Sequence, residues 1–176
     1  MERRRSDDPM VKKAVLLLMA ALLLIPATQA AAADQTLKAD VTYAPLHFLV
    51  DGKEYAPPSD QRGFLYKGST YVPLRFVATI LNKSVGWDKA TAKVTISDPQ
   101  GFGWTDIRKE LGARLVKDSK IEPVDQASLK KTKVTFTMTK ITYEFDGKLV
   151  EPDADKPGLL TGGRVYVPLS FIYRTL

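Results

Sequence analysis

The stretch Tyr71-Val72-Pro73-Leu74 occurs twice in this chain, the second time as Tyr166-Val167-Pro168-Leu169. Each occurrence lies twenty residues after an Asp-Gly-Lys triplet, Asp51-Gly52-Lys53 or Asp146-Gly147-Lys148. A shift of 95 residues aligns the two without a gap, and 13 of the 26 positions that begin at Asp51 are identical. Chance would give about one or two identities in such a window. The sequence therefore indicates an internal duplication, with one structural unit per copy.

The amino-terminal residues have the pattern of a secretory signal. Lys12 and Lys13 precede the apolar residues 14–25, and a run of alanines follows at 30–33. This order predicts a signal peptide over residues 1–33, cleaved after Ala30 or Ala33, and hence a secreted or cell-surface protein. An uncleaved membrane anchor is the alternative, but the apolar run reaches only about 18 Å as a helix, against a hydrocarbon core of about 30 Å. Membrane contact is expected through this segment only.

The remaining chain, residues 34–176, has 21 Lys and Arg against 17 Asp and Glu, interspersed along the sequence. A mild basic excess suits an anionic cell wall or membrane surface, whereas a nucleic-acid binder would cluster its charge, so no nucleic-acid partner is expected. The chain has no cysteine, which excludes disulfides and thiol nucleophiles.

Apolar residues alternate with polar ones in two runs per copy, and the phase of the alternation changes between the runs. A period of two predicts half-buried strands, and Pro45 predicts a break between the first two. Residues 34–40 are expected to be a polar lead-in. The alternating residues are Val41, Tyr43, Leu46, Phe48 and Val50 in the first copy, and Val134, Phe136, Met138, Ile141, Tyr143 and Phe145 in the second.

Turns and helix starts recur in both copies. Asp51-Gly52 and Asp146-Gly147 supply the positive-φ residues of tight hairpin turns. Tyr71 and Tyr166 are expected in the core. Pro73 and Pro168 stand where a helix begins. The apolar face of each helix is predicted from the spacing of Leu74, Val77, Ala78 and Leu81, and of Leu169, Ile172, Tyr173 and Leu176; Asn82 is expected to end the first helix in a left-handed conformation.

The chain divides by these patterns into a signal peptide (1–33), a complete first unit (34–98), a connecting segment (99–132) and a second unit (133–176). The connecting segment is expected to hold a helix over residues 104–115 and a linker over 116–132. The second unit is expected to be incomplete, because it contains no counterpart of residues 82–98, where two strands are predicted.

Together these motifs resemble the copper amine oxidase N-terminal-like, or stalk, domain of exported Gram-positive bacterial proteins. The resemblance covers residues 48–98, including Gly86-Trp87-Asp88-Lys89 and Lys93-Val94-Thr95-Ile96, and again residues 143–176. It implies an α+β fold in which a small twisted antiparallel sheet wraps around one helix, duplicated here with the second copy truncated. It also implies an accessory module without catalytic activity.

The residues themselves assemble no catalytic or cofactor site. Copper prefers several imidazoles, and the chain has one histidine, His47, on the polar side of a predicted strand. Asp153 and Asp155 could form a carboxylate pair, but their Pro-Asp-Ala-Asp-Lys-Pro context is explained by a turn. No enzymatic activity, metal or cofactor is expected.

Two residues are candidates for contact with a ligand or partner. Trp87 could stack on a sugar ring, although packing in the core or between the copies is favoured. Arg75 is expected to brace a neighbouring loop by charge-assisted hydrogen bonds, which Ser170 could not do in the second copy.

These observations predict an exported, non-enzymatic cell-envelope module that acts as a spacer or docking domain. One alternative is a module that binds a cell-wall polymer or carbohydrate; another is a fragment of a longer secreted protein whose functional domain is absent. The expected partners are a wall polymer or another envelope protein. An incomplete second unit would expose strand edges, so a homodimer formed by strand exchange is a further prediction.

Overall fold

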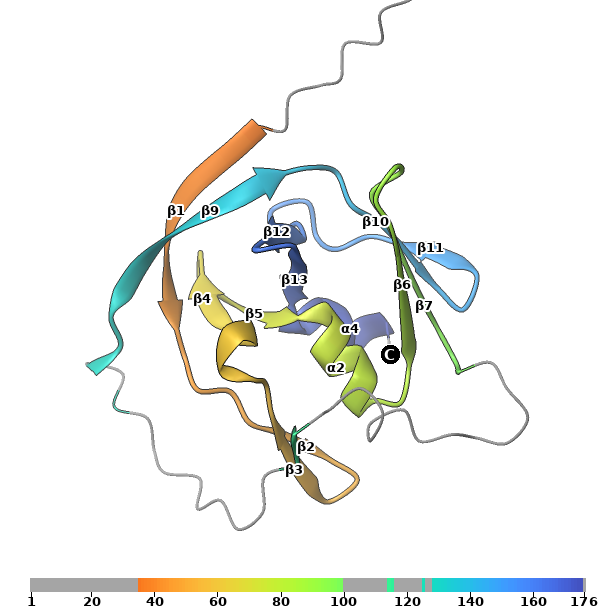
Figure 1. Ribbon diagram of the computed structural model, residues 1–176, viewed down its shortest axis with the longest axis horizontal. Helices are drawn as coiled ribbons and strands as arrows, with labels where there is room; N and C mark the ends of the chain where they lie inside the picture. The colour runs from red at the N-terminus through yellow and green to blue at the C-terminus, as the bar shows by residue number, and fades with distance from the viewer. Residues whose placement is uncertain (1–34, 100–113, 116–124, 126–127, 176) are drawn as a thin grey trace, which may run out of the picture. The chain divides into compact units, whose positions relative to one another are not determined.

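The strands of the first copy follow the predicted breaks and turns. The structure is a computed structural model that describes residues 35–99, 114–115, 125 and 128–175 (Figure 1). The first copy consists of β1 (Gln35–Tyr43), β2 (Phe48–Val50), β3 (Lys53–Ala56), the 3-10 helix η1 (Ser59–Gln61), β4 (Phe64–Tyr66), β5 (Ser69–Pro73), the helix α2 (Leu74–Ile80), β6 (Ser84–Asp88) and β7 (Lys93–Ser97).

The second copy repeats this order as far as its helix. It consists of β9 (Lys131–Met138), β10 (Thr142–Phe145), β11 (Lys148–Val150), β12 (Leu159–Thr161), β13 (Arg164–Pro168) and α4 (Leu169–Thr175). Its hairpins have the registers of the first copy displaced by 95 residues: Phe64 opposite Tyr71 becomes Leu159 opposite Tyr166. Residues 95 apart therefore occupy equivalent positions in the fold.

The architecture is α+β, with mostly antiparallel sheet and two short helices. It differs from two sheets that each wrap around their own helix, because strands of both copies share one closed barrel in the order β1-β4-β5-β13-β12-β9. The copies meet where β1 pairs with β9 and where Val72 of β5 lies opposite Val167 of β13. A four-stranded sheet, β11-β10-β7-β6, also combines both copies, through the parallel pair β7 and β10.

Aromatic rings fill the interior of the barrel. Phe64 is 1% exposed, and its ring centroid lies 5.5 Å from that of Tyr71, 5.8 Å from Phe136 and 5.0 Å from Tyr166. Tyr71 and Tyr166, equivalent residues expected in the core, are 2% and 5% exposed. Because rings at this spacing add contact energy to their burial, this cluster is a main source of stability.

The hairpin turns have the backbone conformation that their sequences predict. Asp51 and Gly52 have φ of 50° and 70°, and Asp146 and Gly147 have φ of 46° and 79°. Two successive positive φ values are the type I′ geometry, which matches the twist of the strands on either side. The turns therefore explain the Asp-Gly pairs without a ligand.

Helix α2 is buried almost all round rather than on one face. Leu74, Phe76, Val77, Ala78, Thr79 and Ile80 are buried, and Arg75 alone within α2 is exposed. The helix begins after Pro73, which is still part of β5. Asn82, at φ 57°, ends it as predicted: its N–H donates to the Thr79 carbonyl and that of Lys83 to the Ala78 carbonyl, the Schellman pattern.

Helix α4 buries a different face from the predicted one. Its buried residues are Phe171 and Ile172, whereas Leu169 is 40% and Tyr173 is 88% exposed. The prediction for Leu169 and Tyr173 was wrong because helical spacing shows which residues share a face, not whether another element covers it. Leu176 lies outside the described residues.

Two other predictions need correction. Residues 35–40 belong to β1 and pair with β9, because β9 supplies backbone partners that do not depend on apolar side chains. Arg114–Leu115 were expected at the end of a helix, but they form a strand, β8, that pairs with β3. The predicted linker was expected to extend to residue 132, but residues 131–132 are the first two residues of β9. The rest of the predicted helix and the signal peptide lie outside the described residues. In the part that is described, no helix has the length and apolarity needed to cross a membrane.

Replacing Tyr143 by phenylalanine is expected to raise the free energy of unfolding by about 1 kcal/mol. Tyr143 is 1% exposed, and its hydroxyl has no hydrogen-bond partner in the described part of the chain. Its equivalent in the first copy is Phe48, which has the same ring without the hydroxyl. Urea unfolding of both proteins measures the change; a loss above about 1 kcal/mol would mean that the hydroxyl is satisfied.

Stability is expected to fall as the pH rises above 10. Burial, with smaller contributions from Tyr66 and Asp155, raises the pKa of Tyr71 from 10.0 to about 12. Burial also raises the pKa of Tyr143 and of Tyr166. Since the unfolded state releases these protons first, the stability present below pH 10 is lost between pH 10 and 12. Urea midpoints across this range test the prediction, and Tyr143→Phe should flatten the fall.

Candidate functional site

In the described part of the chain, an open groove and a narrow pocket lie at equivalent positions of the two copies. The open groove lies between β2, α2 and α4, and its volume is about 940 Å³. The narrow pocket has a volume of about 180 Å³. Six lining residues of the open groove each have their 95-residue equivalent in the narrow pocket: Gly68, Ser69, Thr70, Lys156, Leu169 and Ser170 correspond to Gly163, Arg164, Val165, Gln61, Leu74 and Arg75.

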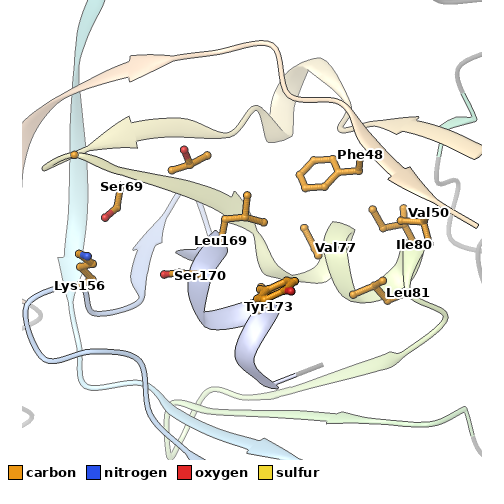
Figure 2. Close-up of a pocket in the computed structure, with 13 residues that line it drawn as sticks. Phe48, Val50, Ser69, Val77, Ile80, Leu81, Lys156, Leu169, Ser170 and Tyr173 are labelled. Carbon is orange, nitrogen blue, oxygen red and sulfur yellow. The ribbon is translucent and has the colours of Figure 1, made fainter. Parts of the chain in front are cut away.

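The open groove is mainly apolar. Figure 2 shows Leu169 and Tyr173 of α4 with Val77 and Ile80 of α2 and Leu81, which follows α2. Phe48 and Val50 of β2 complete one side, and Lys156 lies at the far end. Val77 and Ile80 form its floor and are already buried, so the accessible apolar surface comes chiefly from Tyr173 and Leu169, which are 88% and 40% exposed. The groove therefore presents apolar side chains of α4 to the solvent.

The β6–β7 hairpin accounts for the smaller volume of the narrow pocket. Val85, Gly86 and Trp87 of β6 and Val94 of β7 line that pocket, and the open groove has no such contribution among the described residues. Beside the hairpin in the same sheet, Tyr143 and Phe145 of β10 are 1% and 5% exposed. Their equivalents at the open groove, Phe48 and Val50, are only half-buried.

Ion pairs hold the hairpin in place. Lys83 Nζ lies 2.7 Å from Asp98 Oδ1 and 3.5 Å from Asp146 Oδ2, and its hydrogen bond to Asp98 is the main reason that the pKa of Lys83 is raised. Lys93 Nζ lies 2.7 Å from Glu144 Oε2, which joins β7 to β10. The pair with Asp98 joins the two ends of the hairpin, and the pairs with Asp146 and Glu144 join the hairpin to the second copy.

The tip of the hairpin is closed by Asp88. Its carboxylate accepts hydrogen bonds from the Thr91 hydroxyl at 2.6 Å and from the Ala90 N–H at 2.9 Å. The Thr91 bond is the largest cause of the lowered pKa of Asp88. Asp88, the residue after Trp87, therefore stabilises the turn between β6 and β7.

Both candidate contact residues, Trp87 and Arg75, line the narrow pocket. Trp87 is 37% exposed on β6, which ends the four-stranded sheet among the described strands, so the ring is not fully packed in the core. It does line its pocket together with Leu160 and Val165 of the second copy, which agrees with the other expectation, packing between the copies. Arg75 is exposed, and no side-chain hydrogen bond or ion pair of its guanidinium is found among the described residues, so the predicted bracing of a loop is not seen.

Sequence reasoning missed two polar residues of the narrow pocket, Gln61 and Arg164. Arg164 Nη2 donates to Asp60 Oδ2 at 2.6 Å, a contact between residues of different copies. One signal for Arg164 was present in the sequence, which is that it stands where the first copy has Ser69. No local sequence pattern connects Arg164 with Trp87. The arrangement offers an aromatic ring beside two guanidinium groups, a surface that could contact a polar ligand but holds no acid–base pair.

The motif residues that recur in both copies are mostly buried. Tyr71, Tyr166, Pro73 and Leu74 are buried, as is Pro168, whereas Leu169 lines the open groove.

Comparison with known proteins identifies part of the chain. Residues 49–100 match the family model described as the copper amine oxidase N-terminal domain. These residues form a copper amine oxidase N-terminal-like domain. In that family the N-terminal domain is non-catalytic. The matched residues of this domain include the β6–β7 hairpin and Trp87. No curated protein and no solved structure matches the chain.

The family name implies copper, but the residues present do not fit this metal. The chain has one histidine, and His47 Nδ1 lies 2.5 Å from Glu54 Oε1. Within the described ranges, no three His, Cys, Asp or Glu side chains gather so that they could hold an ion. A copper amine oxidase N-terminal-like domain of this composition lacks the nitrogen donors that copper prefers.

Proposed function

We propose that this chain is an exported, non-enzymatic module of the cell envelope, which docks a partner protein through the open groove. One observation carries the proposal: the groove is mainly apolar, and Tyr173 and Leu169 of α4 are 88% and 40% exposed in it. The non-catalytic character of the matched domain agrees with a structural role. As a spacer, the module would hold the segments attached to it at a distance set by the barrel that the two copies share.

Photo-cross-linking in cells that export the chain tests docking. A cross-linking amino acid at position 173, which is 88% exposed in the groove, is expected to form an adduct with an envelope protein. The matched control is position 149 on β11, whose leucine is 69% exposed and does not line the groove. Equal cross-linking at both positions, or none at 173, would contradict docking through the groove.

A second candidate is binding of a wall polymer or carbohydrate at the narrow pocket. The observation that favours it is that Trp87, Arg75 and Arg164 line one hollow. Stacking of a planar aromatic ring on a ligand face, with guanidinium donors beside it, suits a polar polymer.

Co-sedimentation with purified cell-wall glycan separates the two functions. If the docking proposal is right, Trp87→Ala and Tyr173→Ser bind glycan as weakly as the unaltered chain does. A retention that the unaltered chain shows and Trp87→Ala abolishes, with Tyr173→Ser unchanged, would assign the narrow pocket as a glycan site instead.

A further inference from the structure

We infer that the narrow pocket binds a sugar unit that carries a carboxylate, such as a uronic acid of an acidic polysaccharide. Trp87 stacks on the sugar ring, and the guanidinium groups of Arg75 and Arg164 hold the carboxylate. This inference rests on the second candidate function, because it assigns the same pocket and narrows its ligand to acidic saccharides. It is independent of docking at the open groove, which is lined by other residues.

The floor of the narrow pocket is part of the protein core. Leu74 and Val94 are each 1% exposed, and Val85, Leu160 and Val165 are half-buried against the same core cluster. Core packing therefore fixes the pocket walls, as in small-molecule sites that are largely pre-formed. The volume of about 180 Å³ is below the range of about 300–1,000 Å³ that is usual for whole ligands, so the pocket suits one ring of a longer chain.

The ring of Trp87 is held at the side of this pocket by the β6–β7 hairpin. Trp87 lies opposite Val94 in the antiparallel pair of β6 and β7, and the next residue, Asp88, stabilises the turn. Trp87 is 37% exposed, so part of its side chain is accessible to a ligand. Because a ring fixed in this way loses little freedom on binding, it is suited to stack on the apolar face of a sugar.

The charge around the pocket favours an anion. Neither aspartate nor glutamate is among the described residues that line it. Arg164 Nη2 donates to Asp60 Oδ2 at 2.6 Å, whereas the exposed guanidinium of Arg75 has no carboxylate partner in the described part of the chain. Two guanidinium groups beside one carboxylate leave one positive charge. A single ligand carboxylate would neutralise this charge through charge-assisted hydrogen bonds.

The fold itself does not require an arginine at either position. The equivalents of Arg75 and Arg164 are Ser170 and Ser69, which lie in elements whose bounds match after a displacement of 95 residues. Arg164 also joins the two copies through Asp60, so Arg75 is the better position for a test of binding. The pocket has a further polar group in an amide, which can both donate to and accept from sugar hydroxyls.

Isothermal titration calorimetry of the purified chain with oligogalacturonate tests the inference. The uncharged comparison is the methyl ester of the same oligosaccharide, which keeps every ring and removes the carboxylate charges. The unaltered chain is expected to bind the acid about tenfold more tightly than the ester, because hydrogen bonds to charged groups are stronger than neutral ones. Trp87→Ala is expected to weaken the binding of both by about fivefold, since both stack on its ring.

A sharper test is Arg75→Ser, which introduces the residue that the second copy has at this position. It is expected to weaken binding of the acid by about tenfold and to leave binding of the ester nearly unchanged. The matched control is Lys148→Ser, which removes an exposed lysine of β11 that does not line the pocket. An equal loss with Lys148→Ser, or an equal loss for acid and ester with Arg75→Ser, would overturn the inference.

The outcomes distinguish this inference from the proposed functions. Equal affinity for acid and ester, lost for both in Trp87→Ala, would overturn the acidic ligand and support the second candidate function with a neutral glycan. Binding of neither would overturn the inference, and the co-sedimentation and cross-linking experiments would decide the two proposed functions separately. Oligoglutamate bound as tightly as oligogalacturonate, with the same loss in Arg75→Ser, would overturn the saccharide in favour of an acidic segment of a partner protein.

Discussion

Replacing Phe64 by alanine is expected to lower the free energy of unfolding by about 3–5 kcal/mol. Phe64 is 1% exposed, and its ring lies within 6.1 Å, centroid to centroid, of four others. Those rings, Tyr43, Tyr71, Phe136 and Tyr166, come from β1, β5, β9 and β13. Truncation would leave a cavity in the middle of the barrel, and the barrel could not collapse around it without breaking strand pairs that join the two copies.

Urea unfolding of Phe64→Ala and of Leu149→Ala measures this effect. Leu149 is 69% exposed, so its truncation should change stability by no more than about 0.5 kcal/mol. The loss expected for Phe64→Ala is a large share of a typical free energy of unfolding of about 5–15 kcal/mol. A change below about 1 kcal/mol for Phe64→Ala would show that the aromatic cluster does not hold the barrel together.

Replacing Gly158 by alanine is expected to lower the free energy of unfolding by about 2–3 kcal/mol. A Cβ atom at this position would overlap the hydroxyl oxygen of Tyr143 and lie 2.9 Å from its Cζ. Tyr143 cannot turn away, because its ring is buried and packs edge-on against Phe171 at 5.2 Å. The glycine is needed for close approach, not for a positive φ.

A double-mutant cycle isolates this contact. In the Tyr143→Phe background, Gly158→Ala should cost less by about 1 kcal/mol or more, because the overlapping oxygen is gone while Cζ remains close. The matched control is Gly63→Ala at the equivalent position, where the added Cβ would meet Leu46 and the Tyr71 carbonyl instead. Tyr143→Phe should not reduce the cost of Gly63→Ala. Equal relief at both glycines would contradict the assigned contact.

Local chemistry explains which features could be predicted. The Asp-Gly turns, the break after Tyr43 and the end of α2 at Asn82 each depend on backbone preferences of a few neighbouring residues. The same holds for the burial of Tyr71 and Tyr166, whose alternating context is visible along the chain. The candidate site was partly predictable, since Trp87 and Arg75 were chosen by residue type and both line the narrow pocket.

Contacts between distant segments decided the rest. No local pattern places Arg164 beside Trp87, because β13 and β6 are brought together only when the two copies share a barrel. The helices show the same limit: Leu74 is buried and its equivalent Leu169 is exposed, although their flanking sequences are nearly alike. The difference is the β6–β7 hairpin, which covers one copy and has no described counterpart over the other.

The sequence by itself determined the repeat, the turns and most strand positions of this protein, because each is encoded by residues close together in the chain. The tertiary structure alone decided that both copies close one barrel and that β7 pairs in parallel with β10. The physical reason is that strand pairing depends on which backbone edges meet in space. Equivalent sequences have equivalent strand edges, so the sequence alone does not tell which edge pairs with which strand.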